Sequence, residues 1–499
     1  MNSNFKKLFD LNKSNQTFES LERLLFWDQE TMMPKNGINI KTLQKKELAS
    51  LIHSKKTSKE YKEALLKLID IDSGQILDKD LDIDQKRCVE VMRSDYQKAV
   101  KLPNSFVSKM AEVSSEATHT WIEAKEKNDF AMLEPHLQSV IDLMREKADH
   151  LGYEDHPYDA LVNEYEPHMT VKTLDNLFNP LKESLSNLTK KCAKNRADDS
   201  FLYGVFDTDT QLEIGKKLLL EMGLEEGNYR LDLSAHPFCM PVHANDLRLT
   251  TRIEDSSFHQ CLSATMHEGG HALYEQGILA DQFGLPIGQN ASIGVHESQS
   301  KFWETFIGQS LPFLKGFYPK LQSAFPKQLG NTPLSDYYEA VNLVQPSLIR
   351  IHADEVTYGL HVILRYEIEK AFVEGKMKVK DLPEVWNEKM EKYLGMSPHT
   401  NREGCLQDIH WPSAHFGYFP TYALGNLYAA QLFNEMKTDH PDYELKLENC
   451  EYLFIKKWLE EKVHQHGRRY DPQDLIEKAT GKKLSSDAFT KYLESKYTK

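Results

Sequence analysis

Residues 266–273 place the strongest constraint on the fold of this chain, because they read Met-His-Glu-Gly-Gly-His-Ala-Leu. On a helix, His267 and His271 are four residues apart, so both imidazoles project from one face and can reach one metal ion. Glu268 follows the first histidine, where it can accept a proton from a water on the open side of that metal. The stretch therefore predicts a helix with two metal ligands and a general base, and a third ligand elsewhere in the chain.

The motif has a simpler alternative, a surface helix that happens to carry two histidines. The chain has 20 histidines in 499 residues, so a pair at this spacing is expected about once by chance. Gly269 and Gly270 argue against that alternative. Each glycine within a helix costs about 1 kcal/mol relative to alanine, and such a break of a local rule is typical of a functional site where something approaches closely.

The third ligand has two neighbouring candidates in the stretch 294–300, which opens a further helical run. Glu297 lies 26 residues after His271, which leaves room for a helix, a loop and a return. Two histidines and one glutamate form the ligand set of a catalytic zinc of the thermolysin type. His296 competes for the same role, but its side chain points about a quarter-turn away, so only one of the two can face the metal.

Hydrophobic spacing divides the chain into two helical parts with a short region of strands between them. Residues 18–25 and 83–102 are examples of the helical pattern in the first two hundred residues. From about residue 230 the period changes to two, and residues 229–253 predict a small antiparallel β hairpin. This hairpin either receives a peptide as an additional strand or only positions the helix that follows. Beyond residue 340 the helical pattern returns.

Composition excludes several classes of protein. The formal net charge is −14 and no basic stripe stands out, which argues against a nucleic-acid binder. The six cysteines are scattered without a CxxC pair, as expected of reduced thiols. The amino-terminal residues lack the apolar core of a signal peptide, and no apolar stretch approaches the length of a membrane-spanning helix. We therefore expect a cytoplasmic protein that binds neither nucleic acid nor membrane.

Six short motifs occur in an order that resembles the thermostable carboxypeptidase family, the carboxypeptidase Taq group of metallocarboxypeptidases. The resemblance extends over nearly the whole chain. The motifs are His236-Pro237-Phe238, Asp246-x-Arg248-x-Thr250, His267-Glu268-Gly269-Gly270-His271, His296-Glu297-Ser298-Gln299, Ile349-Arg350-x-x-Ala353-Asp354 and Gly404-x-x-Gln407-Asp408-x-His410-Trp411.

The resemblance implies a single all-α, neurolysin-like domain over residues 1–499, with a deep groove and the small β element of residues 229–253 at its wall. It implies a homodimer that releases single C-terminal residues from peptides with broad specificity. One divalent metal per chain, zinc or alternatively cobalt, is implied, with His267, His271 and Glu297 as ligands and Glu268 as general base. The spacing of the residues leads to these four positions independently, whereas the exopeptidase activity rests on the resemblance.

Further candidates follow from the chemistry of peptide hydrolysis. The tetrahedral oxyanion needs a donor besides the metal, and His410, Tyr418 and Tyr422 are candidates, although the tyrosines could equally be core residues. Asp354 and Asp408 are candidates for holding the ligand histidines by hydrogen bonds, although Asp354 could instead cap its helix.

A carboxypeptidase must also bind a free α-carboxylate, for which arginine is best suited. Arg350 is our first candidate because it has no evident partner nearby in sequence. Arg248 is the second, although pairing with Asp246 on the same strand face is a structural alternative. His236, in the first motif, is a further candidate for substrate binding.

Three other functions fit parts of this pattern. The protein could be a metallo-oligopeptidase that cleaves internal bonds, or a non-catalytic peptide-binding protein with the same fold, although the intact Glu268 argues against the latter. Two histidines and a carboxylate also serve non-haem iron oxygenases, but those enzymes do not need a glutamate beside the first ligand.

Overall fold

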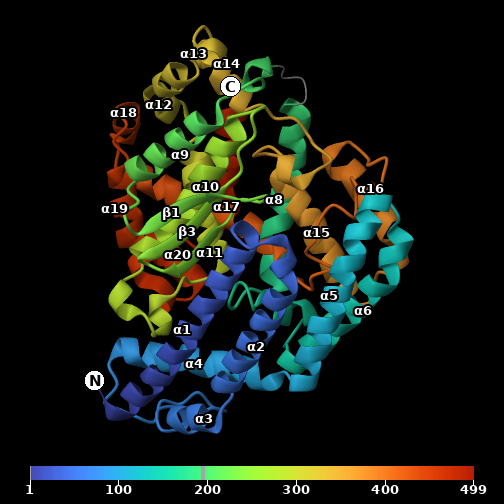
Figure 1. Ribbon diagram of the computed structural model, residues 1–499, viewed down its shortest axis with the longest axis vertical. Coiled ribbons are helices and arrows are strands. Elements are labelled where there is room, and N and C mark those ends of the chain that lie inside the picture. The colour runs from blue at the N-terminus through green and yellow to red at the C-terminus, as the bar shows by residue number, and fades with distance from the viewer. Residues whose placement is uncertain (1, 193–196, 499) are drawn as a thin grey trace.

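The computed structural model describes residues 2–192 and 197–498, and most of them are helical (Figure 1). The predicted helical first part is confirmed, and the expected break at Pro103 separates α4 from α5. The helices before the strands are α1 (Ser3–Thr31), α2 (Ile38–Lys56), α3 (Lys59–Leu66), α4 (Ile83–Lys101), α5 (Asn104–Lys127), α6 (Phe130–Leu151), α7 (Pro157–Val162), α8 (Val171–Cys192) and α9 (Thr208–Met222).

Helices resume directly after the strands; those at the HExxH motif, at residues 294–300 and beyond residue 340 are predicted by the sequence. They are α10 (His259–Gly277), α11 (Ile293–Lys301), α12 (Leu311–Ala324), α13 (Pro326–Leu329), α14 (Leu334–Val341), α15 (Tyr358–Val373), α16 (Leu382–Leu394), α17 (Phe419–Asp439), α18 (Tyr443–Glu448), α19 (Leu453–Lys462), α20 (Pro472–Thr480) and α21 (Asp487–Tyr497). None of the helices in the described part of the chain is both long and apolar enough to cross a membrane.

The small sheet differs from the predicted hairpin. Strands β1 (Tyr229–Leu233), β2 (Cys239–His243) and β3 (Asp246–Thr251) lie in the order β1-β3-β2. The two expected strands, β1 and β3, are parallel neighbours, and β2 pairs antiparallel with β3. The prediction was therefore wrong in its pairing and missed β2. Pro241 argues against a strand in the sequence, which is why β2 was not predicted. Proline is nevertheless tolerated on an edge strand, because its missing N–H can face away from the sheet.

The N-terminal helices pack on the rest of the molecule through α1 and α4. A small apolar core, formed by these helices together with Ile287 of the turn Pro286–Gly288, is separate from the main core. Helix α1 also packs against β2, and in Figure 1 it runs below the sheet toward the bottom of the molecule. The small core includes Phe5, Leu8, Tyr61, Leu65, Val89, Met92 and Ile287.

Helices α10, α11 and α17 form the centre of the main core, and glycines set how closely they approach. A Cβ atom on Gly270 of α10 would lie 2.5 Å from the carbonyl oxygen of Gln299 and 2.7 Å from the Cα of Ser300. A Cβ on Gly425 of α17 would lie 2.5 Å from Cγ of Glu297. The close approach expected from the paired glycines is confirmed, and it presses α11 between α10 and α17.

Candidate active site

The two histidines of α10 and Glu297 of α11 converge on one point. Nε2 of His267 and Nε2 of His271 lie 3.7 Å and 3.6 Å from Oε2 of Glu297. Ligand atoms bound tetrahedrally with bonds of about 2.0–2.2 Å are about 3.4 Å apart, so this set fits a divalent metal. Among the described residues, these three side chains form the one group of three or more His, Cys, Asp or Glu residues whose possible ligand atoms all lie within 4.8 Å of one another.

The geometry favours Glu297 over its neighbour as the third ligand. Nε2 of His296 lies 3.1 Å from Oε1 of Glu275, and the ring stacks on that of His271 at 4.3 Å between centroids. Glu297 is buried, and its Oε2 accepts a hydrogen bond of 3.2 Å from Ser300. Helix α11 begins at an N-cap, Ser292, whose hydroxyl accepts the N–H of Val295. The cap and the close packing at Gly270 together fix where Glu297 points.

The carboxylate that holds a ligand histidine is Glu304, which the sequence analysis missed. Its Oε2 lies 2.8 Å from Nδ1 of His267, and its Oε1 accepts a 2.8 Å hydrogen bond from Ser263. Lys301 donates to the same carboxylate at 2.9 Å. A carboxylate on Nδ1 fixes the tautomer that leaves Nε2 as the ligand atom. Glu304 follows Glu297 by seven residues, two helical turns, and this spacing is the signal that could have identified it.

Glu304 lies in a π-helical turn, Phe302–Ile307, that continues α11. A π-helical turn changes the direction of side chains relative to a continuous α-helix and is frequent at functional sites.

The two aspartates predicted to hold the ligand histidines lie elsewhere, which corrects that prediction. Asp354 accepts the N–H groups of Val356 and Thr357 at 2.9 Å and 3.0 Å, as in the capping alternative. Asp408 pairs with two arginines instead, Arg350 and Arg365. Neither pairing was visible locally, because Asp408 lies 58 residues from Arg350 and 43 from Arg365.

Glu268 is buried beside the metal ligands. The pKa of its carboxyl is raised to about 7: burial is the largest cause, the charge of His267 opposes it, and the charges of Glu297 and Glu304 add to it. A carboxyl with a pKa near neutrality can both accept and return a proton at that pH. The position and the pKa therefore suit the predicted general base.

His410, Tyr418 and Tyr422 form an aromatic cluster at the start of α17. The ring centroids of the two tyrosines are 5.3 Å apart, and Nε2 of His410 lies 3.4 Å from the hydroxyl of Tyr422. Burial raises the pKa of Tyr418 to about 12, with a contribution from the charge of Glu297, and raises that of Tyr422 well above its usual value. Burial lowers the pKa of His410 to about 3. At neutral pH the tyrosines are therefore protonated donors and the histidine is uncharged.

Arg350 lies next to this cluster and is largely buried. Its guanidinium carbon is 5.1 Å from the ring centroid of Tyr422, and its Nη1 donates to the hydroxyl of Tyr358 at 3.2 Å. Lys301, the partner of Glu304, lies 5.2 Å from the ring centroid of Tyr358. The sequence shows no partner for Arg350 nearby, whereas the structure pairs it with Asp408 at 3.0 Å. A chain of contacts thus joins Arg350 to the metal ligands.

The other two predicted substrate-binding residues are near the sheet. The guanidinium of Arg248 donates hydrogen bonds of 2.5 Å and 3.0 Å to Asp246, which is the pairing predicted as the structural alternative. The same guanidinium lies over the ring of Trp27. His236 is exposed in the bend between β1 and β2.

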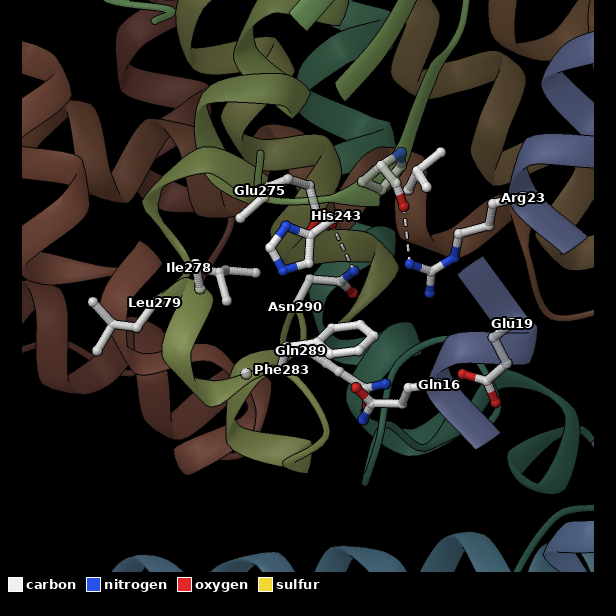
Figure 2. A pocket seen from close by; sticks show the side chains of 15 residues that line it. Gln16, Glu19, Arg23, His243, Glu275, Ile278, Leu279, Phe283, Gln289 and Asn290 are labelled. Carbon is white, nitrogen blue, oxygen red and sulfur yellow. Dashed lines mark hydrogen bonds between the residues drawn. The ribbon is translucent and has the colours of Figure 1, made fainter. Parts of the chain in front are cut away.

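A pocket between α1 and β2 adjoins the HExxH helix (Figure 2). Glu275, one turn after His271, lines it and accepts a 3.0 Å hydrogen bond from Asn290. Arg23 of α1 donates at 3.0 Å to the carbonyl of Pro241, which faces away from β3 in this register. A cavity of about 420 Å³ adjoins this pocket, and both are lined by Gln16, Glu19, Arg23, Gln289 and Asn290.

Comparisons with known proteins agree with this geometry. Residues 7–497 match the family described as Carboxypeptidase Taq (M32) metallopeptidase. The chain is 41% identical to "Carboxypeptidase 1" of Bacillus subtilis, over 99% of this chain and 98% of that protein. It is 38% identical to "Thermostable carboxypeptidase 1" of Thermus thermophilus, with the same coverage.

Solved structures superpose closely along the full length. The M32 carboxypeptidase from Deinococcus radiodurans has a TM-score of 0.96 at 34% identity and 99% coverage of both chains. Pyrococcus furiosus carboxypeptidase has a TM-score of 0.95 at 35% identity and covers 100% of this chain and 99% of its own. The mainly helical fold expected from the sequence is confirmed, and the chain belongs to the carboxypeptidase Taq (M32) metallopeptidase family.

Proposed function

We propose that this protein is a metal-dependent carboxypeptidase that releases single C-terminal residues from peptides with broad specificity. The observation that carries the proposal is the ligand triad His267, His271 and Glu297 with the buried Glu268 beside it, in a chain of the carboxypeptidase Taq family. A non-catalytic peptide-binding protein would not need a buried carboxyl of raised pKa at this position.

Glu268 is the general base and then the general acid. The divalent metal, when bound, lowers the pKa of a water and polarises the scissile carbonyl. Glu268 accepts a proton from the attacking water and passes it to the nitrogen of the departing residue, for which a pKa near 7 is suited. Glu304 holds the His267 ring through both steps.

Tyr418 and Tyr422 are the donors for the oxyanion. Both hydroxyls remain protonated at neutral pH, so each can donate a hydrogen bond to negative charge as it develops. His410 is uncharged and lies within 3.4 Å of the Tyr422 hydroxyl, so we assign it the role of orienting that hydroxyl.

Arg350 binds the α-carboxylate of the substrate. It lies beside Tyr422, and it is largely buried, which strengthens a charge-assisted pair. Arg248 is less suited because it lies at the sheet, on Asp246 and the ring of Trp27, whereas Arg350 lies on the ring of Tyr422. His236, exposed beside β2, is assigned to contacts with residues farther from the cleaved bond.

Other properties of the enzyme are proposals from family membership. We propose one metal per chain, zinc first and cobalt second, and a cytoplasmic homodimer. We further propose that residues 1–499 form one domain, with a deep groove whose wall includes the sheet of residues 229–253.

Removal and replacement of metal test the proposal. The purified protein should contain about one equivalent of divalent metal per chain, lose peptidase activity on dialysis against a chelator, and regain it with zinc or cobalt. Full activity in metal-free protein would contradict it. Sedimentation velocity would test the homodimer separately.

A further inference from the structure

Two buried arginines share a single carboxylate beside the proposed substrate site. Nε and Nη2 of Arg350 donate to Oδ1 of Asp408 at 3.1 Å and 3.0 Å. Nε of Arg365 donates to Oδ2 of the same carboxylate at 2.6 Å. The Arg365 side chain is completely buried on α15, and its Nη1 donates to the carbonyl of His361 at 2.7 Å. One carboxylate therefore serves two guanidiniums.

The hydrogen-bonded triad of Arg350, Arg365 and Asp408 carries more positive than negative charge. Arg365 and Arg350 outweigh the effect of burial and hold the pKa of Asp408 well below its usual range, so the carboxylate is ionised. Burial lowers the pKa of Arg365 only to about 10, so it stays charged at neutral pH. His361 and His410, the neighbouring titratable rings, are neutral because burial lowers the pKa of each to about 3. Two cations and one anion leave a net charge of +1 on these three hydrogen-bonded side chains. Glu369, which the charge of Arg365 also reaches, accepts hydrogen bonds from Tyr158, Trp411 and the N–H of Gly417 instead, and burial raises its pKa to about 7.

A buried net charge is costly unless a partner of opposite sign is supplied. Arg350 is the member of the triad that can bind such an anionic partner. A guanidinium has five N–H donors, and Asp408 and Tyr358 account for three of those of Arg350 among the described residues. The remaining donors belong to Nη1 and Nη2, the pair that binds a carboxylate through two parallel hydrogen bonds.

We propose that Arg365 is a positioning residue that balances Asp408, so that the charge of Arg350 remains available to the α-carboxylate of the substrate. This inference rests on the proposed function for the identity of the anion. Without Arg365, Arg350 and Asp408 would be a neutral pair, and the site would lose its attraction for a carboxylate. The ring of Trp386, 4.6 Å from the guanidinium carbon, and that of Phe419, at 5.4 Å, hold Arg365 in place.

Binding by metal-loaded variants tests the proposal. Each variant also carries Glu268→Gln, so that the peptide is not hydrolysed. The probes are an acetylated tripeptide with a free C-terminal carboxylate and the same tripeptide as its C-terminal amide, with Kd measured by calorimetry or competition. Arg365→Met should weaken carboxylate binding at least about ten-fold, the effect of one charge-assisted hydrogen bond, and leave amide binding within about two-fold.

Two further variants test whether charge is the cause. Arg365→Lys keeps the charge and should bind the carboxylate within about three-fold of the parent. Arg365→Met combined with Asp408→Asn restores the net charge of +1 and should recover most of the lost affinity. Equal losses for carboxylate and amide, or no recovery in the double variant, would overturn the proposal. Because these measurements need no turnover, an inactive parent enzyme would refute the proposed function without affecting them.

Discussion

At the scale of single residues, the site depends on a few side chains whose partners come from different elements. Glu297 is oriented by Ser300 within its own helix, and His267 by Glu304 on the π-helical turn that follows. Because Glu297 and His267 are each held by a partner of their own, substitutions should separate metal binding from proton transfer.

Substitution of the proposed base should remove turnover and leave the metal. Glu268→Gln keeps the size of the side chain but cannot accept the proton, so kcat should fall by about 10²–10⁴-fold. Metal content after dialysis and the circular dichroism spectrum should match those of the parent. A metal-loaded variant with near-normal kcat would exclude Glu268 as the base.

The choice of the third ligand is tested by two adjacent substitutions. Glu297→Ala removes a metal ligand and should leave the protein largely metal-free after dialysis, whereas His296→Ala should retain its metal because that ring faces Glu275. Metal content by mass spectrometry distinguishes the two. The opposite result would show that the neighbouring histidine is the ligand.

At the scale of elements, the decisive feature is the crossing of α10 and α11 at Gly270. The Cβ absent from Gly270 would meet backbone atoms of α11, and the one absent from Gly269 would meet the side-chain ends of Leu219 and Met222. Side-chain ends can move aside to make room for a methyl group, whereas the backbone of a packed helix cannot. An added methyl group should therefore destabilise the protein more at Gly270 than at Gly269.

Gly270→Ala should therefore move α11 and weaken the site. Overpacking costs about 1–3 kcal/mol, more than the roughly 1 kcal/mol gained in helix propensity, so Tm and metal affinity should both fall. Gly269→Ala is the matched control and should lose less of each. Thermal unfolding and titration with a competing chelator measure the two effects. Equal behaviour of the variants would contradict this view of the helix crossing.

The sequence predicted these elements better than it predicted how they pair. Helical spacing and the HExxH motif were sufficient for α10 and α11, because helix formation and ligand spacing are local. Alternation located β1 and β3 but not their parallel pairing, since alternation identifies a strand without saying which other strand lies beside it. Asp408 and Glu304 were missed or misassigned because burial and distant partners decide their roles, and neither is visible in a local pattern.

At the scale of the whole molecule, the candidate site is assembled from four distant parts of the chain. Residues 267–271, 297–304, 350–365 and 408–422 converge, and α1 closes a pocket beside them. Such an assembly depends on the stability of the main core, in which buried histidines are kept neutral. His464, packed against Tyr274 and Gln299, is one of these.

The buried histidines should make the fold sensitive to acid. Burial lowers the pKa of His464 to about 3, while in the unfolded chain it is about 6.5. Below pH 6.5 the unfolded chain therefore binds the additional proton, and the stabilisation present above pH 6.5 is lost by up to about 1.4 kcal/mol per pH unit.

His464→Gln keeps a hydrogen-bonding group beside Gln299 but cannot titrate. The variant should be less stable than the parent at pH 7, and the difference should shrink between pH 6.5 and pH 5. Urea unfolding midpoints at several pH values give this comparison. A constant difference across that range would show that His464 does not contribute to the pH dependence.

The central claim, that this chain is a metal-dependent carboxypeptidase, is tested most directly by identifying its products. An acetylated peptide of about ten residues, incubated with the metal-loaded protein and followed by mass spectrometry, should yield a ladder of species shortened one residue at a time from the C-terminus. The same peptide with an amidated C-terminus should be cleaved far more slowly. Internal fragments, or an intact peptide in the presence of fully metal-loaded protein, would contradict the account.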